Sequence, residues 1–244
     1  MNGMIKVILI DWGKNNIKSE RNMGFDWFYN KQGVYSILKN MRQRKSQPFE
    51  LILVINDASL ENEYDYLQDE FKFIETIIYR SSNMGLDWGG YNEGVQYLKK
   101  QSYEGDLILM NSGCIGPTTN DWIDPYAKLF NSDDNVGLVG TTYCGYAICL
   151  EEQPFSPHIQ SYFLYSSMSI VTSILSDGLP GLYTDEKSSV IEKAEIEFSQ
   201  KVLKKGYCIK AKLDNFHYSL GDPWVFFNKK MEPKFWPGCF PFYI

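Results

Sequence analysis

The sequence predicts an α/β fold, a single domain with a mostly parallel, twisted β-sheet flanked by helices. Short apolar runs alternate along the chain with segments of helical periodicity. The apolar runs are nearly continuous, as expected for parallel strands that are covered on both faces. A length of 244 residues suits one large domain, and no linker rich in Gly, Ser or Pro divides the chain.

The predicted elements follow from these patterns in chain order. The predicted strands are residues 5–10, 49–55, 73–80, 106–110, 136–142 and 207–213. The predicted helices are residues 34–43, an acidic segment near 60–70, a segment that contains Trp88 to Leu98, and 187–205. Residues 144–167 mix polarity and contain two prolines, which indicates an active-site loop with one inserted strand.

Composition argues against several kinds of partner and site. The net charge of −6, without a run of Lys or Arg, argues against nucleic acid. Five cysteines without a CxxC pair argue against a zinc site or a disulfide framework and favour a reducing compartment. No signal peptide is recognisable, and no apolar stretch approaches the ~20 residues that span a bilayer. We therefore expect a soluble, cytoplasmic protein without a transmembrane segment.

Polar or glycine-rich residues follow four of the predicted strands. Ligands of open α/β sheets bind beyond the carboxyl ends of the strands, so these residues are candidates for one shared crevice. They are Asp11, Asp57, Arg80, Asn83, Gly85, Asp87, Gly90, Asn111, Ser112 and Gly113. The first strand is not followed by GxGxxG, and GxxxxGK[ST] and the kinase motifs are missing, which argues against dinucleotide-binding, Walker-type and kinase sites.

Three segments carry a resemblance to a known family. LILVINDAS (51–59), NMGLDWGGYNEG (83–94) and DLILMNSGCIGP (106–117) resemble the nucleotide-sugar half of GT-A-type glycosyltransferases, particularly the rhamnan-synthesis (rhamnosyltransferase-like) group. LVGTTYC, PHIQSYFLYS and AEIEFSQKVLKKGY extend the likeness over roughly residues 4–215. The resemblance implies one domain, residues 1–244. Its parts would be a nucleotide-sugar-binding half (1–115), an acceptor and catalytic half (116–220) and an aromatic tail (221–244).

The resemblance also implies roles in donor binding. Asp57 would bind the base or ribose of a nucleotide-diphosphate sugar, although it could instead cap a helix. The 83–92 turn would let the main chain approach the donor, with Asp87 holding a hydroxyl. The alternative is a tight strand–helix turn that needs positive φ. GT-A enzymes usually carry Asp-x-Asp where this chain has Asn111-Ser112-Gly113, so no cofactor is certain. Either Mg²⁺ or Mn²⁺ is held differently, or Arg80, a lysine and backbone N–H groups neutralise the diphosphate.

The helix at 187–205 supplies the candidate catalytic base. At ~100° per residue, Glu195 falls at the edge of an apolar arc, where burial would suit a carboxylate to accept a proton. The alternative is a partly buried glutamate satisfied by Ser199 or a lysine. His158 would orient the acceptor, or act as the base if Glu195 does not. The candidate acceptor-binding residues are Gln160 and Trp224.

These observations predict a glycosyltransferase. It would move a sugar, with a deoxyhexose such as rhamnose suggested by the resemblance, from a nucleotide-diphosphate donor to a glycan or glycoconjugate acceptor with inversion. Two alternatives stay open. One is a non-catalytic protein that binds glycan or nucleotide sugar, which the missing acidic pair permits. The other is a sugar-1-phosphate nucleotidyltransferase, whose arginine-bearing, glycine-rich loop is not matched by DWGKNN.

Overall fold

The computed structural model describes most of the chain. Residues 4–13, 33–114, 116–144 and 156–212 are described in full, and residues 21–22, 31–32 and 216–218 as backbone. Trp224 and the predicted tail lie outside the described residues. Within the described part, no helix is both long enough and apolar enough to cross a membrane.

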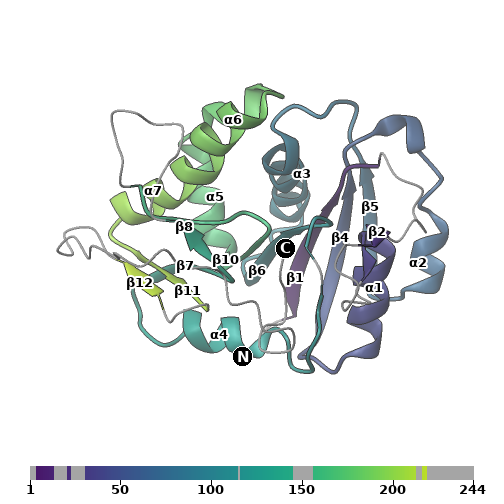
Figure 1. Ribbon diagram of the computed structural model, residues 1–244, viewed down its shortest axis with the longest axis horizontal. Helices are drawn as coiled ribbons and strands as arrows, with labels where there is room; N and C mark the ends of the chain where they lie inside the picture. Colours follow the sequence, from purple (N-terminus) through teal and green to yellow (C-terminus); the bar gives the residue numbers. More distant parts are fainter. Residues whose placement is uncertain are drawn as a thin grey trace.

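The main sheet of the described residues has eight strands in the order β12-β11-β7-β10-β6-β1-β4-β5 (Figure 1). The strands are β1 (Ile5–Asp11), β4 (Phe49–Ile55), β5 (Ile74–Tyr79), β6 (Asp106–Asn111), β7 (Val136–Gly140), β10 (Phe163–Ser167), β11 (Cys208–Ala211) and β12 (Phe216–Tyr218). β1 pairs in parallel with both β4 and β6, and β4 pairs in parallel with β5. β10 is antiparallel to β6 and β7, whereas β7 and β11 are parallel. β12 runs antiparallel to β11 at the edge.

Shorter strands and helices complete the described fold. Two small antiparallel pairs are β2 (Arg21–Asn22) with β3 (Lys31–Gln32) and β8 (Tyr143–Cys144) with β9 (His158–Ile159). The α-helices are α1 (Val34–Gln43), α2 (Tyr66–Glu70), α3 (Leu86–Lys100), α4 (Asp124–Phe130), α5 (Met168–Ser176), α6 (Lys187–Val190) and α7 (Glu197–Lys204). Two 3₁₀ turns, η1 (Ala58–Leu60) and η2 (Pro180–Tyr183), and a π-helical segment, η3 (Ile191–Ile196), complete the set.

The predicted fold class is confirmed: a mostly parallel sheet is flanked by helices on both faces (Figure 1). Each predicted strand has a counterpart, and the inserted strand is β10. The helix predicted near residues 60–70 is correct only for its second part, because η1 ends at Leu60 and turns occupy residues 61–65. The helix predicted over 187–205 is continuous but changes type twice, from α6 through η3 to α7. The helices α4 and α5 were not predicted.

The core lies on both faces of the sheet. Successive side chains of a strand point to opposite faces, so Val7 and Leu9 pack on one side and Ile8 and Ile10 on the other. Buried residues of α1, α2 and α4 belong to the first cluster, and those of α3, α5 and α7 to the second. Burial on both faces explains why the strands read as continuous apolar runs.

Close packing of α3 on β1 brings the start of α3 to the end of that strand. A Cβ atom at Gly90 would lie 2.8 Å from the side chain of Ile10, and one at Gly94 would lie 2.7 Å from Ile8. Real Cβ atoms do not approach so closely, so glycine is needed for the helix to lie against the sheet. Packing against β1 thus accounts for glycine at position 90, and the contact of Gly90 with a donor stays a prediction.

Candidate functional site

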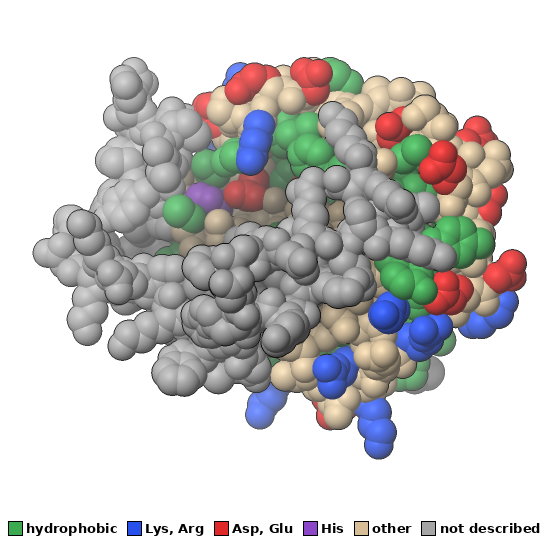
Figure 2. All heavy atoms as spheres, turned by 45° about the vertical axis from the view of Figure 1, so that its right-hand side comes forward, with side chains coloured by type: hydrophobic (Ala, Val, Ile, Leu, Met, Phe, Trp, Pro, Cys, Tyr) green, Lys and Arg blue, Asp and Glu red, His purple; other side chains and the backbone are tan. Residues whose placement is uncertain are grey.

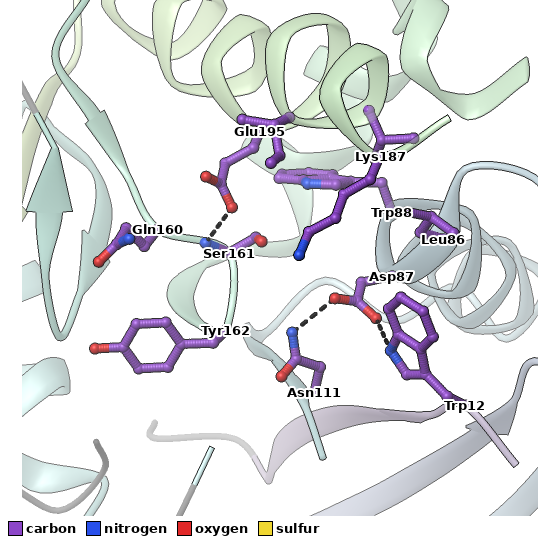
Figure 3. Close-up of a pocket in the computed structure, with 12 residues that line it drawn as sticks. Trp12, Leu86, Asp87, Trp88, Asn111, Gln160, Ser161, Tyr162, Lys187 and Glu195 are labelled. Atoms are coloured by element: carbon purple, nitrogen blue, oxygen red, sulfur yellow. Dashed lines mark hydrogen bonds between the residues drawn. The ribbon is translucent and has the colours of Figure 1, made fainter. Parts of the chain in front are cut away.

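A pocket of about 300 Å³ opens where β1 and β6 end, between the start of α3 and the α6–η3 segment (Figure 3). It is lined by Trp12, Leu86, Asp87, Trp88, Asn111, Gln160, Ser161, Tyr162, Lys187, Val190, Ile191 and Glu195. In the space-filling view of Figure 2, a hollow holds hydrophobic, acidic and histidine side chains side by side. Because β1 has parallel neighbours on both sides, the pocket lies at the switch point where ligands of open α/β sheets bind.

Asp87 joins three segments of the pocket wall. Its Oδ1 accepts a hydrogen bond from Trp12 Nε1, and its Oδ2 accepts one from Asn111 Nδ2, both at 2.7 Å. Burial raises the pKa of Asp87 from 3.8 to about 6, although the bonds from Trp12 and Asn111 lower it. The carboxylate therefore ties the ends of β1 and β6 to the first turn of α3, as the clustering of polar strand ends predicted.

Asn111 is oriented by its own loop. Its Oδ1 accepts a hydrogen bond from the Gly113 N–H at 3.0 Å, which leaves its Nδ2 to donate to Asp87. Ser112 does not line the pocket, because its hydroxyl donates to Asp11 Oδ1 at 2.5 Å. Asp11 also accepts from the Tyr64 hydroxyl at 2.7 Å. Asp11 and Ser112 thus connect β1 to the loop after β6, and these two residues and Gly113 stand outside the pocket lining.

Asp57 also stands outside the lining. It ends the turn after β4 and caps η1, since its Oδ1 accepts from the Ser59 N–H at 2.9 Å. The structure therefore contains the capping arrangement that the sequence left open as an alternative. The contact of Asp57 with a base or ribose stays a prediction.

Arg80 holds the turn that leads into α3. Its guanidinium is buried, and it donates to Asn56 Oδ1 at 2.7 Å and to the Met84 carbonyl at 2.6 Å. Arg80 does not line the pocket. Three hydrogen bonds to the protein hold its guanidinium, which gives it a structural role, and its contact with a diphosphate stays a prediction.

Gly85 starts α3 in the left-handed conformation, with φ of 74°. Its N–H donates to the Thr184 carbonyl at 2.7 Å, which links this turn to the segment before α6. The carbonyl of Asn83 accepts from the Leu86 N–H, whereas its buried side-chain oxygen has no partner in the described part of the chain. A turn that needs positive φ, one of the two alternatives from the sequence, is therefore present at Gly85.

Glu195 faces the pocket from η3, opposite Asp87 (Figure 3). Its side chain is 14% exposed, and its Oε2 accepts from the Ser161 N–H at 2.8 Å. The Ser199 hydroxyl accepts from the Ile159 N–H, and no hydrogen bond joins it to Glu195 among the described residues. The predicted position of Glu195 on a buried margin therefore agrees with the structure. The segment that carries it is π-helical, a geometry that is frequent at functional sites.

His158 lies behind Glu195 and does not line the pocket. Its Nδ1 is 2.8 Å from the Ser156 carbonyl oxygen, and its Nε2 is 3.7 Å from Glu195 Oε1. A carbonyl can only accept, so Nδ1 carries the hydrogen and Nε2 faces the carboxylate. Of the other two acceptor-side candidates, Gln160 lines the pocket and accepts from the Thr142 hydroxyl at 2.6 Å, whereas Trp224 lies outside the described residues.

Several lining residues were not predicted, above all Trp12, Tyr162 and Lys187. Trp12 directly follows the first strand, which was the available signal. No group of three or more His, Cys, Asp or Glu side chains is placed to hold a metal ion within the described part of the chain. The residues of the pocket thus do not fit the Mg²⁺ or Mn²⁺ site that Asp-x-Asp forms in GT-A enzymes.

Comparison with solved structures finds weak similarity of fold. S. aureus TarS 1–349 in complex with UDP is 13% identical, with 89% of this chain and 60% of that chain covered and a TM-score of 0.48. The inositol-1-phosphate CTP transferase from T. maritima is 12% identical, with 86% of each chain covered and a TM-score of 0.47. The chain thus spans less than two thirds of that TarS chain. A search of curated proteins found no match.

A family model matches most of the chain. Residues 51–229 match the model described as Rhamnan synthesis protein F. These residues include the turn with Asp87, the end of β6 and the η3 segment with Glu195, so the match extends over both walls of the pocket. It supports glycosyl transfer as the class of activity. The chain belongs to the rhamnan synthesis protein F family.

Proposed function

We propose that this protein transfers a sugar, a deoxyhexose such as rhamnose, from a nucleotide-diphosphate donor to a glycan acceptor with inversion. One observation carries the proposal: two carboxylates, Asp87 and Glu195, face the same pocket from opposite walls at the carboxyl edge of the sheet (Figure 3). Family membership supplies the reaction class, and the pocket supplies the residues that would perform it.

Asp87 would hold the donor sugar. Each of its oxygens accepts one hydrogen bond inside the protein, and an ionised carboxylate has about four lone-pair sites. It can therefore accept further bonds from sugar hydroxyls without losing its partners. The rings of Trp12, Trp88 and Tyr162 also line the pocket, and flat aromatic faces suit the apolar faces of sugars.

Glu195 would be the general base. The acceptor hydroxyl oxygen attacks the anomeric carbon, the bond from that carbon to the diphosphate oxygen breaks, and its electron pair leaves with the nucleoside diphosphate. The proton of the hydroxyl passes to Glu195, and a single displacement of this kind inverts the anomeric centre. The Ser161 N–H holds one oxygen of Glu195, and Nε2 of His158 lies 3.7 Å from the other, so we assign His158 as a positioning residue.

A binding protein without catalysis is the second candidate. It is favoured by the lack of an acidic metal cluster among the described residues. The two candidates share the donor pocket and differ only in turnover. They can therefore be separated by assays that measure donor binding and sugar transfer independently.

The test begins with a thermal-shift screen of UDP-, GDP- and dTDP-sugars. A donor at 100 times its Kd should stabilise the protein by about 2.7 kcal/mol. Hydrolysis and transfer are then measured with and without EDTA for the wild type, Glu195→Gln and Glu192→Gln. Glu192 is the matched control, because it lies on the same segment outside the pocket lining.

We expect Glu195→Gln to lower turnover by about 10²- to 10⁴-fold while donor binding is retained, and Glu192→Gln to have little effect. Donor binding without turnover in the wild type would favour the binding protein. A wild type that binds no nucleotide sugar would refute both candidates. Equal turnover of the wild type and Glu195→Gln would remove Glu195 from the mechanism.

A further inference from the structure

We propose that Lys187 binds the diphosphate of the donor and stabilises it as it leaves. This inference rests on the proposed function and assigns the group that meets the negative charge of the donor. Every nucleotide-diphosphate donor carries a pair of linked phosphoryl groups, whose oxygens are strong hydrogen-bond acceptors.

Lys187 is placed to reach such a ligand. It begins α6, is exposed on its outer side, and lines the pocket. In Figure 3 its side chain extends across the pocket with its amino group directed toward Asp87. The charge of Lys187 also lowers the pKa of Asp87, which agrees with an ammonium group close to that carboxylate.

No partner inside the described protein occupies this amino group. Asp87 accepts hydrogen bonds from Trp12 and Asn111 at 2.7 Å, and no carboxylate of the described residues lies within 4.0 Å of the Lys187 amino group. Lys187 is also the only Lys or Arg among the described residues that line the pocket. Arg80, the cation that the sequence suggested, is bound to the turn before α3. The ammonium group is therefore available to a ligand.

The start of α3 supplies a second observation that favours an anion. Trp88 lies in the first turn of α3 and lines the pocket, although its own Nε1 is buried and does not reach the open part of the cavity. The positive end of a helix dipole favours an anion nearby.

The two carboxylates of the pocket make a positive charge necessary for binding a diphosphate. Asp87 and Glu195 both face the cavity, so a diphosphate without a counter-ion would meet two like charges. An ammonium group is a compact point charge with three donors, which suits phosphoryl oxygens of changing geometry. When the anomeric bond breaks, the added negative charge on the leaving oxygen strengthens this interaction, as catalysis requires.

The test compares binding of a nucleoside diphosphate with binding of its nucleoside. UDP, GDP and dTDP are titrated calorimetrically against the wild type, and the tightest is then used with uridine, guanosine or thymidine as its partner probe. The variants are Lys187→Met, which removes the charge, and Lys187→Arg, which keeps it. Lys193→Met is the matched control, because Lys193 is exposed on the adjoining segment and does not line the pocket. Thermal unfolding confirms that each variant folds.

We expect Lys187→Met to weaken nucleoside diphosphate binding by about 10- to 100-fold, the range of a hydrogen bond to a charged group, and to leave nucleoside binding unchanged. Lys187→Arg should retain most of the affinity, and added salt should weaken the wild type more than Lys187→Met. Equal affinity of Lys187→Met and Lys193→Met would overturn this inference alone. A wild type that binds no nucleoside diphosphate would overturn the proposed function together with it.

Discussion

Replacement of Asp87 by Asn tests the electrostatics of the pocket. Burial raises the pKa of Asp87 from 3.8 to about 6, so the folded protein holds this proton after the unfolded chain has released it. At 1.36 kcal/mol per pKa unit, the difference corresponds to about 3 kcal/mol. The stabilisation is complete below the unfolded pKa and is lost as the pH rises through the folded pKa.

The variant lacks this pH dependence because a side-chain amide neither binds nor releases a proton in this pH range. The stability of the wild type relative to Asp87→Asn should therefore fall as the pH rises, by about 2 kcal/mol between pH 4.5 and 7.5. Any hydrogen bond that the variant loses to Trp12 or Asn111 shifts the whole curve and leaves its slope unchanged.

Urea unfolding of both proteins across this pH range measures the difference. Asp134→Asn is the matched control, because Asp134 is exposed in the turn before β7 and reports any general effect of removing a carboxylate. A difference between the wild type and Asp87→Asn that is constant with pH, or that changes in the opposite direction, would refute the reasoning from burial.

Three further variants probe neighbouring contacts. Gly90→Ala should lower the free energy of unfolding by about 1–3 kcal/mol, because the new Cβ would meet a β1 side chain at 2.8 Å; urea unfolding measures this, and an unchanged midpoint contradicts it. Trp12→Phe removes an N–H that lowers the pKa of Asp87, so the pKa of Asp87 should rise above about 6. NMR of the Asp87 carboxyl carbon across a pH titration measures this. A lower pKa would contradict the hydrogen bond from Trp12. His158→Gln should lower kcat by about 10- to 100-fold, because Glu195 would be misplaced. The KM for the donor should stay unchanged, and the pH profile of kcat should change. An unchanged kcat would show that His158 does not position Glu195.

Sequence reasoning was most reliable where burial alone decides the structure. Residues 49–55 form β4 within the predicted limits because a strand that is covered on both faces must be apolar throughout. The helix α5 was not predicted because its residues 168–176 follow β10 directly, without a loop, and Ser167, which ends the strand, also caps the helix. Local pattern cannot separate two buried elements that adjoin in this way.

The site divides along similar lines. Asp87 could be predicted because it stands in a glycine-rich turn after a strand, where ligands of this fold class bind. Lys187 could not, because its place in the pocket depends on how α6 lies against α3, which no local pattern encodes. Arg80 was assigned to the ligand for its charge, and only the structure reveals that backbone carbonyls already hold its guanidinium.

The π-helical segment sets the angle from which Glu195 enters the pocket. Loss of one residue there would turn everything on one side of the deletion by about 100° relative to the other. The buried faces of α6 and α7 could not then both stay packed in the hydrophobic core. The direction in which Glu195 points thus depends on the helical rotation of residues 191–196. Insertions or deletions in this segment should alter the position of the carboxylate and the packing of the helices together.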